Sequence, residues 1–240
     1  MNQTNDKQKA EQYRQAAEQG DAEAMFQLGW CYSLGRGIPK NQAEAEKCWT
    51  TAVEIWKKAA EQGDTKAQCR LADCYYHGWS VPEDKTEAVQ WYRKAAELGH
   101  TEAMYNLGRY YCGFWKDGVD AAEGMRWYHQ AAEQGDAGAL CELGRCYFYG
   151  KYVSEDKAEA VKWFRKAAEQ DDSYVAYELG ICYIHGWGVS QDIIEAEKWL
   201  KAARSEAEKR LRAAGLPMDT EDIDTILTAI ELTRKEMERS

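Results

Sequence analysis

The chain has 240 residues, of which 45% are hydrophobic and 30% are charged, and its formal net charge is −10. This composition excludes a disordered tail, because the chain has enough apolar side chains to bury a core. No run of about 18 apolar residues is present to span a membrane. The excess of acidic residues argues against nucleic acid as the partner. We therefore expect a soluble, acidic protein that binds neither a membrane nor nucleic acid.

The N-terminal segment and the cysteines bear on the redox compartment. Residues 1–9 carry no apolar stretch after their charges, so they do not resemble a secretory signal. We therefore expect a cytoplasmic location, where the eight cysteines stay reduced and form no disulfide framework.

A tyrosine recurs along the chain at a nearly constant interval. Intervals of 43, 36, 36 and 36 residues separate Tyr32, Tyr75, Tyr111, Tyr147 and Tyr183. The residue before four of these tyrosines is a cysteine: Cys31, Cys74, Cys146 and Cys182. A position that accepts Cys, and once Tyr, beside a constant Leu and Tyr is a packing position, where free cysteine behaves as a small hydrophobe. We expect these four thiols to be buried.

A second block repeats at the same interval. The tripeptide Ala-Ala-Glu occurs at residues 16–18, 59–61, 95–97, 131–133 and 167–169. Self-similarity of this length is typical of a solenoid, in which each repeat is one supersecondary unit that packs on its neighbours. The stripe Ala24, Leu28, Cys31 and Tyr32 has the spacing of an amphipathic helix, and no strand pattern is present. The predicted fold class is therefore all-α.

In chain order, the pattern predicts an N-terminal capping helix over residues 1–20, then five helix–turn–helix repeats, then a C-terminal cap. The repeats cover residues 21–63, 64–99, 100–135, 136–171 and 172–203. The first helix of each repeat (helix A) ends at a glycine-rich turn. The second (helix B) begins at a side chain that can cap a free N-terminus: Asn41, Asp84, Asp120, Asp156 or Asp192. Residues 204–240 extend the last B helix and add a terminal helix with one apolar face, made of Ile223, Ile226, Leu227 and Ile230.

Two repeats depart from the pattern. The first B helix has seven extra residues, about two turns, so both Trp49 and Trp56 could fill its aromatic position. We expect this helix to be longer than its counterparts. In the third repeat, residues 113–118 replace the usual Gly-x-Gly-Val, so that turn should differ.

The full pattern resembles the Sel1-like repeat, a relative of the tetratricopeptide repeat. The last repeat carries it most completely, in Ala176, Leu179, Gly180, Tyr183, the segment 186–189, Asp192, Ala196 and Trp199. The resemblance extends over residues 9 to 203 and recurs five times. It implies a right-handed α-solenoid that serves as a scaffold or adaptor for other proteins, without identifying the partner.

No set of residues indicates catalysis, a cofactor or a metal. Cys74/His77 and Cys182/His185 each place two ligand types at i, i+3. The two pairs lie three repeats apart, and at about 8–10 Å per helix layer they cannot share one ion. No glycine-rich phosphate loop follows a strand, and the four histidines lie apart. We therefore predict a protein that is not an enzyme and that needs no metal or cofactor.

The tetratricopeptide resemblance implies that the A helices line a concave groove. The residues expected to face this groove occupy equivalent positions in successive repeats, and each set of equivalent positions is here called a column. These columns are rich in aromatic side chains and arginine, which dominate protein-binding hot spots. Arg70, Arg109 and Arg145 form a basic track that would pair with an acidic partner segment. The candidate partner-binding residues are Trp30, Arg70, Asp73, Tyr76, His77, Tyr105, Asn106, Arg109, Arg145, Phe148, Tyr149, Tyr177 and His185.

Two other interpretations of these aromatic residues stay open. Phe26, Tyr105 and Tyr177 could instead pack between adjacent A helices. The turn tryptophans, Trp79, Trp115 and Trp187, form a second and weaker candidate patch.

The sequence thus favours a protein–protein interaction scaffold or adaptor. One alternative is a module that associates weakly with itself. Another is a β-lactam-binding or weakly hydrolysing enzyme, as in a cysteine-rich branch of the Sel1-like family. That branch carries a cysteine near the end of each B helix, and the B-helix ends here carry none.

Overall fold

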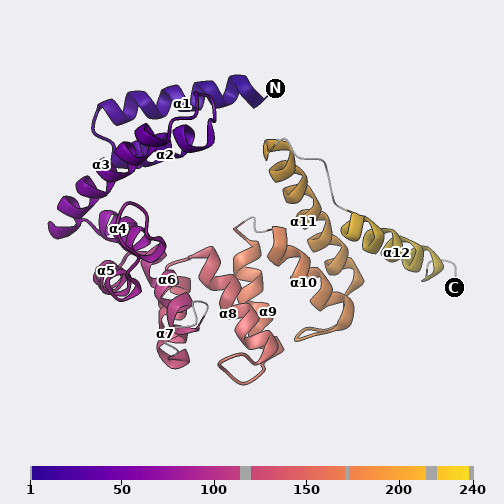
Figure 1. The fold of residues 1–240 in the computed structure, drawn as a ribbon. Coiled ribbons are helices and arrows are strands. Elements are labelled where there is room, and N and C mark those ends of the chain that lie inside the picture. The colour runs from indigo at the N-terminus through magenta and orange to yellow at the C-terminus, as the bar shows by residue number, and fades with distance from the viewer. Residues whose placement is uncertain (1, 114–119, 171–172, 215–220, 238–240) are drawn as a thin grey trace. The chain divides into compact units, whose positions relative to one another are not determined.

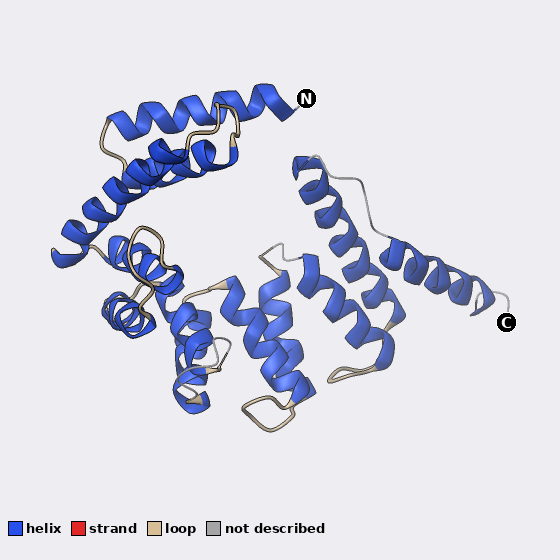
Figure 2. Ribbon diagram, viewed as in Figure 1, coloured by secondary structure: helices blue, strands red, loops and turns tan. Residues whose placement is uncertain are grey.

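The computed structural model describes residues 2–113, 120–170, 173–214 and 221–237. Within these ranges the chain forms twelve α-helices joined by loops, without a strand (Figure 2). The predicted all-α class is confirmed. None of the described helices combines the length and the apolar character that crossing a bilayer requires.

The chain divides into two compact units, Met1–Leu107 and Gly108–Ser240. The first unit holds five complete helices and most of a sixth (Figure 1): α1 (Asn2–Glu18), α2 (Ala22–Leu34), α3 (Gln42–Glu61), α4 (Thr65–His77), α5 (Lys85–Glu97) and α6 (Thr101–Tyr111). In this unit α1 packs on α2, α2 on α3, α3 on α4 and α4 on α5. Helices that are consecutive in the sequence are therefore neighbours in space, as expected for stacked repeats.

The second unit continues the same order from the end of α6. Its helices are α7 (Ala121–Glu133), α8 (Ala137–Tyr149), α9 (Lys157–Ala168), α10 (Ser173–His185), α11 (Ile193–Ala214) and α12 (Glu221–Met237). Here α7 packs on α8, α8 on α9, α9 on α10, α10 on α11 and α11 on α12.

The ends of the helices form as their local chemistry predicts. Each predicted cap of a B helix accepts a hydrogen bond from the backbone N–H three residues further on: Asn41, Asp84, Asp120, Asp156 and Asp192. The N–H of the same five residues donates to the carbonyl of the recurring tyrosine, at 2.8 to 3.0 Å. The recurring tyrosine thus marks the place where the backbone of each turn is fixed. The expected difference in the third turn concerns residues that fall mainly outside the described ranges.

A small residue in each A helix lets the paired B helix approach closely. A Cβ atom added at Gly29 would overlap the indole of Trp49, and one added at Gly144 would overlap the ring of Phe164. In both pairs the aromatic residue follows the glycine by 20 positions. Trp49 therefore takes the repeat position that the sequence left open between Trp49 and Trp56. The seven extra residues extend the C-terminal end of α3, which has 20 residues where α5 has 13.

The C-terminal helix covers the last repeat. Ile230 of α12 is buried with Ala196 and Leu200 of α11. The other three residues of the predicted apolar face pack on this cluster: Ile223, Ile226 and Leu227.

Candidate functional site

A cavity of about 290 Å³ opens on the first unit, between α2 and α4. Helix α2 contributes residues at the i, i+3, i+4, i+7 spacing of one helical face, and α4 contributes three residues at i, i+3, i+4. The lining residues are Glu23, Phe26, Gln27, Trp30, Trp56, Arg70, Asp73, Cys74 and Trp79.

Four aromatic side chains form the apolar walls of this cavity. The ring of Phe26 is buried and lies 5.3 Å from the rings of both Trp56 and Trp79, centroid to centroid, and 6.4 Å from that of Trp30. Trp49 fixes the backbone behind them, because its Nε1–H donates to the carbonyl of Phe26 at 3.1 Å. The rings support one another and still leave Trp30 and Trp79 partly open to solvent.

Trp79 reaches the cavity from the turn after α4. Gly78 ends that helix in the left-handed conformation, with φ of 69°. The Trp79 indole then stacks on the exposed imidazole of His77, with centroids 4.3 Å apart and planes inclined by 21°. The turn tryptophan therefore folds back over the repeat edge.

Acidic groups surround the one guanidinium that lines the cavity. Arg70 contacts Glu23 at 3.1 Å, Asp73 at 3.1 Å and Glu102 at 3.2 Å. Burial lowers the pKa of Arg70, but the three carboxylates outweigh this effect and raise it overall. Burial raises the pKa of Asp73, although hydrogen bonds from Tyr92 and Arg70 oppose that change. Carboxylates therefore outnumber the guanidinium three to one.

This arrangement corrects the expectation of a basic track available to an acidic partner. Arg70 is already held by three carboxylates of its own unit. In the second unit, Arg145 pairs with Glu142 at 3.0 Å, and its guanidinium lies over the ring of Tyr174, 4.7 Å from the centroid. The carboxylates come from the same columns of the repeat as the arginines, or from neighbouring ones. Arg109 is half-buried on α6.

Three of the predicted groove residues, Trp30, Arg70 and Asp73, meet in this cavity. Asn106 does not face solvent as predicted, because only 8% of it is exposed. Its side chain is therefore largely removed from solvent. Tyr76 and Tyr105 are half-buried, and Tyr76 meets the ring of His77 edge to face at 4.7 Å.

The predicted residues of the second unit follow a separate arrangement. Tyr177 packs on the cluster of Ala196 and Leu200 of α11 and Ile230 of α12, so this side chain contributes to the core at the end of the array. Two others, Phe148 and His185, lie beside Trp187, which is 5.6 Å from the ring of Phe148 and stacks on His185 at 4.5 Å. Tyr149 is 65% exposed and meets Phe148 edge to face. Trp115 lies outside the described residues.

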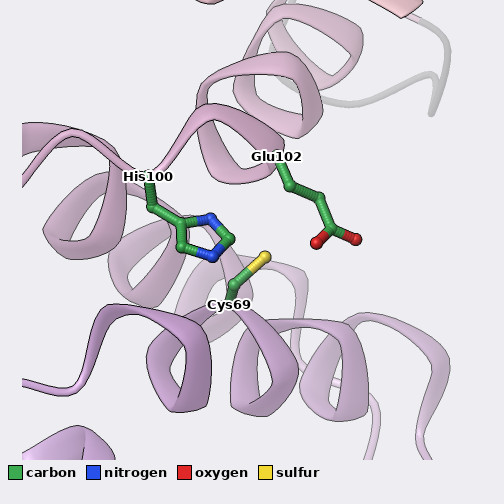
Figure 3. A group of neighbouring side chains, drawn as sticks. All are labelled: Cys69, His100 and Glu102. Atoms are coloured by element: carbon green, nitrogen blue, oxygen red, sulfur yellow. The ribbon is translucent and has the colours of Figure 1, made fainter. Parts of the chain in front are cut away.

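A second cluster of polar groups lies next to Arg70, at the start of α6. Cys69 on α4, His100 just before α6 and Glu102 in its first turn bring their sulfur, imidazole nitrogen and carboxylate oxygen within 4.8 Å of one another (Figure 3). Burial is the main cause that lowers the pKa of His100 and raises that of the Cys69 thiol. These are side chains that can bind a transition metal.

The recurring cysteines are packing residues, as predicted. Cys31, Cys74, Cys146 and Cys182 are all buried, and none of the eight cysteines, all of them described, forms a disulfide. Burial raises the pKa of Cys74, Cys146 and Cys182 to about 12. A thiol with so high a pKa is a poor nucleophile.

Sequence reasoning missed two features of these sites. The sequence left open whether Phe26 packs between A helices and whether Trp56 fills the aromatic position of its helix, and both side chains line the cavity. The available signal for Trp56 was the seven-residue extension, which carries a second tryptophan to the face of the first. The cluster of Cys69, His100 and Glu102 joins two repeats, so the spacing of ligand types within one helix does not indicate it.

Comparison with known proteins supports the repeat assignment. The family model for the Sel1 repeat matches the chain six times, over residues 6–21, 22–64, 65–100, 101–136, 137–172 and 173–206. No curated protein sequence matches the chain significantly.

Several solved structures share the fold. A Sel1 repeat protein from Oxalobacter formigenes is 33% identical, with a TM-score of 0.56 over 78% of this chain and 74% of that one. A protective antigen of uropathogenic Escherichia coli with an SLR fold is 27% identical, with a TM-score of 0.58 over 93% of this chain. The match spans 56% of that antigen's length. An immunity protein from Pseudomonas aeruginosa is 23% identical over 88% of this chain and 81% of that one, with a TM-score of 0.50, and shows the fold alone.

The six family matches cover most of the chain, and the two structures of higher identity are solenoids of the same repeat. The predicted solenoid is therefore confirmed, and the chain belongs to the Sel1 repeat family.

Proposed function

We propose that this protein is a non-catalytic interaction module, and that the cavity between α2 and α4 holds an anchoring side chain of a partner protein. Proteins of this repeat family commonly act as protein-interaction scaffolds. The observation that supports the site is the cavity of about 290 Å³ with four aromatic walls. Concave sites with apolar walls and few polar groups are the usual form of a binding pocket.

The charges favour a basic anchor over the acidic one expected from the sequence. Glu23 and Asp73 line the cavity, and Glu102 shares Arg70 with them. A lysine or arginine side chain would meet the aromatic rings of Trp30 and Trp79, which attract cations, and the surplus of carboxylates around Arg70. The net charge of −10 also speeds the approach of a basic segment at low salt.

The test selects peptides from a random displayed library on the full chain, then measures the affinity of the selected peptides for variants. Trp30→Ala should weaken binding by about 2 kcal/mol, roughly thirtyfold, as for a hot-spot aromatic residue. Glu23→Gln keeps the shape of the side chain but removes its charge, and it should weaken the binding of peptides that have a basic anchor.

Tyr149→Ala is the matched control, because this aromatic residue is exposed on the second unit and lies outside the cavity. It should leave the affinity unchanged. Peptides that bind Trp30→Ala and Glu23→Gln as tightly as the unchanged chain, with the fold intact by circular dichroism, would move the site elsewhere. A loss with Tyr149→Ala alone would place it on the second unit.

A further inference from the structure

Departures from the repeat pattern converge in space beside α4. The residue that caps an A helix is Asp21, Asp64 or Asp136 at three places, and each accepts a backbone hydrogen bond at 2.8 to 3.0 Å. At the start of α6 this residue is His100. The position of Cys69 on α4 is aromatic in three of the other A helices. Among the residues that the structure describes, a histidine at the cap position and a cysteine on the preceding A helix meet at this junction of repeats.

His100 is a poor substitute for aspartate as a cap. Its Nδ1 accepts the N–H of Ala103 at 3.3 Å, which is longer than any of the three aspartate caps. Because this cap hydrogen bond is weak, the helix loses little stabilisation if the imidazole binds another ligand.

The geometry suits a small, borderline-soft cation. The Cys69 sulfur points into the space between the imidazole and the Glu102 carboxylate (Figure 3), and the three ligand atoms lie within 4.8 Å of one another. Tetrahedral Zn²⁺ holds sulfur at about 2.3 Å and nitrogen or oxygen at about 2.0–2.2 Å, so its ligand atoms lie about 3.5 Å apart. Side-chain rotations that move each ligand atom by about 1 Å would bring the three atoms to the separation that Zn²⁺ requires.

The local charge also favours a cation. The carboxylates of Glu23 and Asp73 share Arg70 with Glu102, so negative groups remain in excess around the cluster. Glu102 has two oxygens, and Arg70 Nη1 contacts one of them, Oε1. The second oxygen can bind a metal without breaking the ion pair. Cys69 is 1% exposed, so its sulfur is shielded from bulk solvent.

We propose that Cys69, His100 and Glu102 bind one Zn²⁺ ion, with the fourth position left to water. On binding, the Cys69 thiol releases its proton to solvent, and the thiolate sulfur donates an electron pair to the metal. If the imidazole binds through Nε2, its proton moves to Nδ1, and the bond from Ala103 is given up. This site shares no side chain with the lining of the partner-binding cavity proposed above, although Glu102 contacts Arg70, which does line it.

The test adds Co²⁺, as a spectroscopic substitute for Zn²⁺, to the reduced, metal-free full chain. A thiolate bound to Co²⁺ gives a charge-transfer absorption band, which should saturate at one ion per chain and disappear when Zn²⁺ is added. Cys69→Ser should abolish the band. Cys141→Ser is the matched control, because Cys141 occupies the same repeat position on α8 and is also buried. It should keep the band.

His100→Asn keeps the result interpretable if the cysteine variant folds poorly. Asparagine is a strong helix cap, already used by this chain at Asn41, and it lacks the imidazole. This variant should fold at least as well as the unchanged chain and bind Co²⁺ at least about tenfold more weakly. Absence of the band in the unchanged chain, or an equal band in Cys69→Ser and His100→Asn, would overturn the proposal.

Discussion

The buried cysteines show how one residue type serves the repeat. Cys146 and Cys182 occupy the same position in α8 and α10, and both are buried as free thiols. Burial raises the pKa of each to about 12, because the thiolate would lose its hydration. They act as small apolar side chains, and their chemistry is suppressed by the packing that surrounds them.

This pKa shift predicts that the protein loses stability in alkali. The folded chain keeps the two thiol protons to a higher pH than the unfolded chain does. The stabilising contribution is therefore complete below about pH 8.5, the pKa of an exposed thiol, and is lost as the pH rises toward 12. Each thiol should reduce the free energy of unfolding by at most about 1.4 kcal/mol per pH unit in this window.

Urea unfolding between pH 8 and pH 10.5 measures the effect. Cys182→Ala should lower the free energy of unfolding at every pH. It should also make that free energy depend less steeply on pH, because one buried thiol no longer contributes to the slope. An unchanged slope in this variant would show that the Cys182 thiol is not protected by burial.

At the level of elements, the extension of α3 gives this B helix 20 residues, where α5 has 13. It adds Trp56, which is 7% exposed and packs against Phe26 at 5.3 Å. Two helical turns separate Trp56 from Trp49, so both indoles lie on the same face of the helix. The extension therefore supplies one wall of the cavity without disturbing the contact between Gly29 and Trp49.

Removing the Trp56 indole should destabilise the fold. Trp56→Ala should reduce the free energy of unfolding by about 3–5 kcal/mol, as expected when a buried tryptophan leaves a cavity. Lys57→Ala, at the exposed neighbouring position of the same helix, is the control and should change it by less than about 0.5 kcal/mol. Equal urea midpoints for the two variants would show that the extension contributes little to the core.

The last helix should protect the end of the array. Deleting residues 216–240 removes Ile230 and exposes the apolar surface of Leu200, which is fully buried in the complete chain. About 25 cal/mol per Å² of apolar burial is lost with it. The truncated chain should melt at a lower temperature and form aggregates, as measured by light scattering. A monomeric truncated chain with unchanged melting would free α12 for another role.

For the whole molecule, the sequence was sufficient to predict the features that depend on recurring local chemistry. The caps at Asn41 and Asp156 follow from the capping ability of their side chains, and the paired helices follow from the apolar spacing. The cavity could not be predicted in the same way, because it combines a helix extension, a turn residue and two A helices.

Charge was the other feature that the repeat columns could not give. The columns placed Arg70 on an accessible face, but they could not show that Glu23 and Glu102, on the neighbouring A helices, reach its guanidinium. A column compares equivalent positions, whereas an ion pair depends on which rotamers of long side chains meet across two helices. The predicted partner-binding residues therefore remain a proposal, centred on Trp30 and Asp73.

The most direct test of this account is a double-mutant cycle between the cavity and a selected peptide. The affinity is measured for the unchanged chain and for Glu23→Gln, each with the peptide and with a version whose basic anchor is replaced by glutamine. We predict a coupling free energy of about 1 kcal/mol or more, because the two changed groups contact each other. Effects that add within about 0.3 kcal/mol would contradict the proposed anchor, since groups that do not meet behave independently.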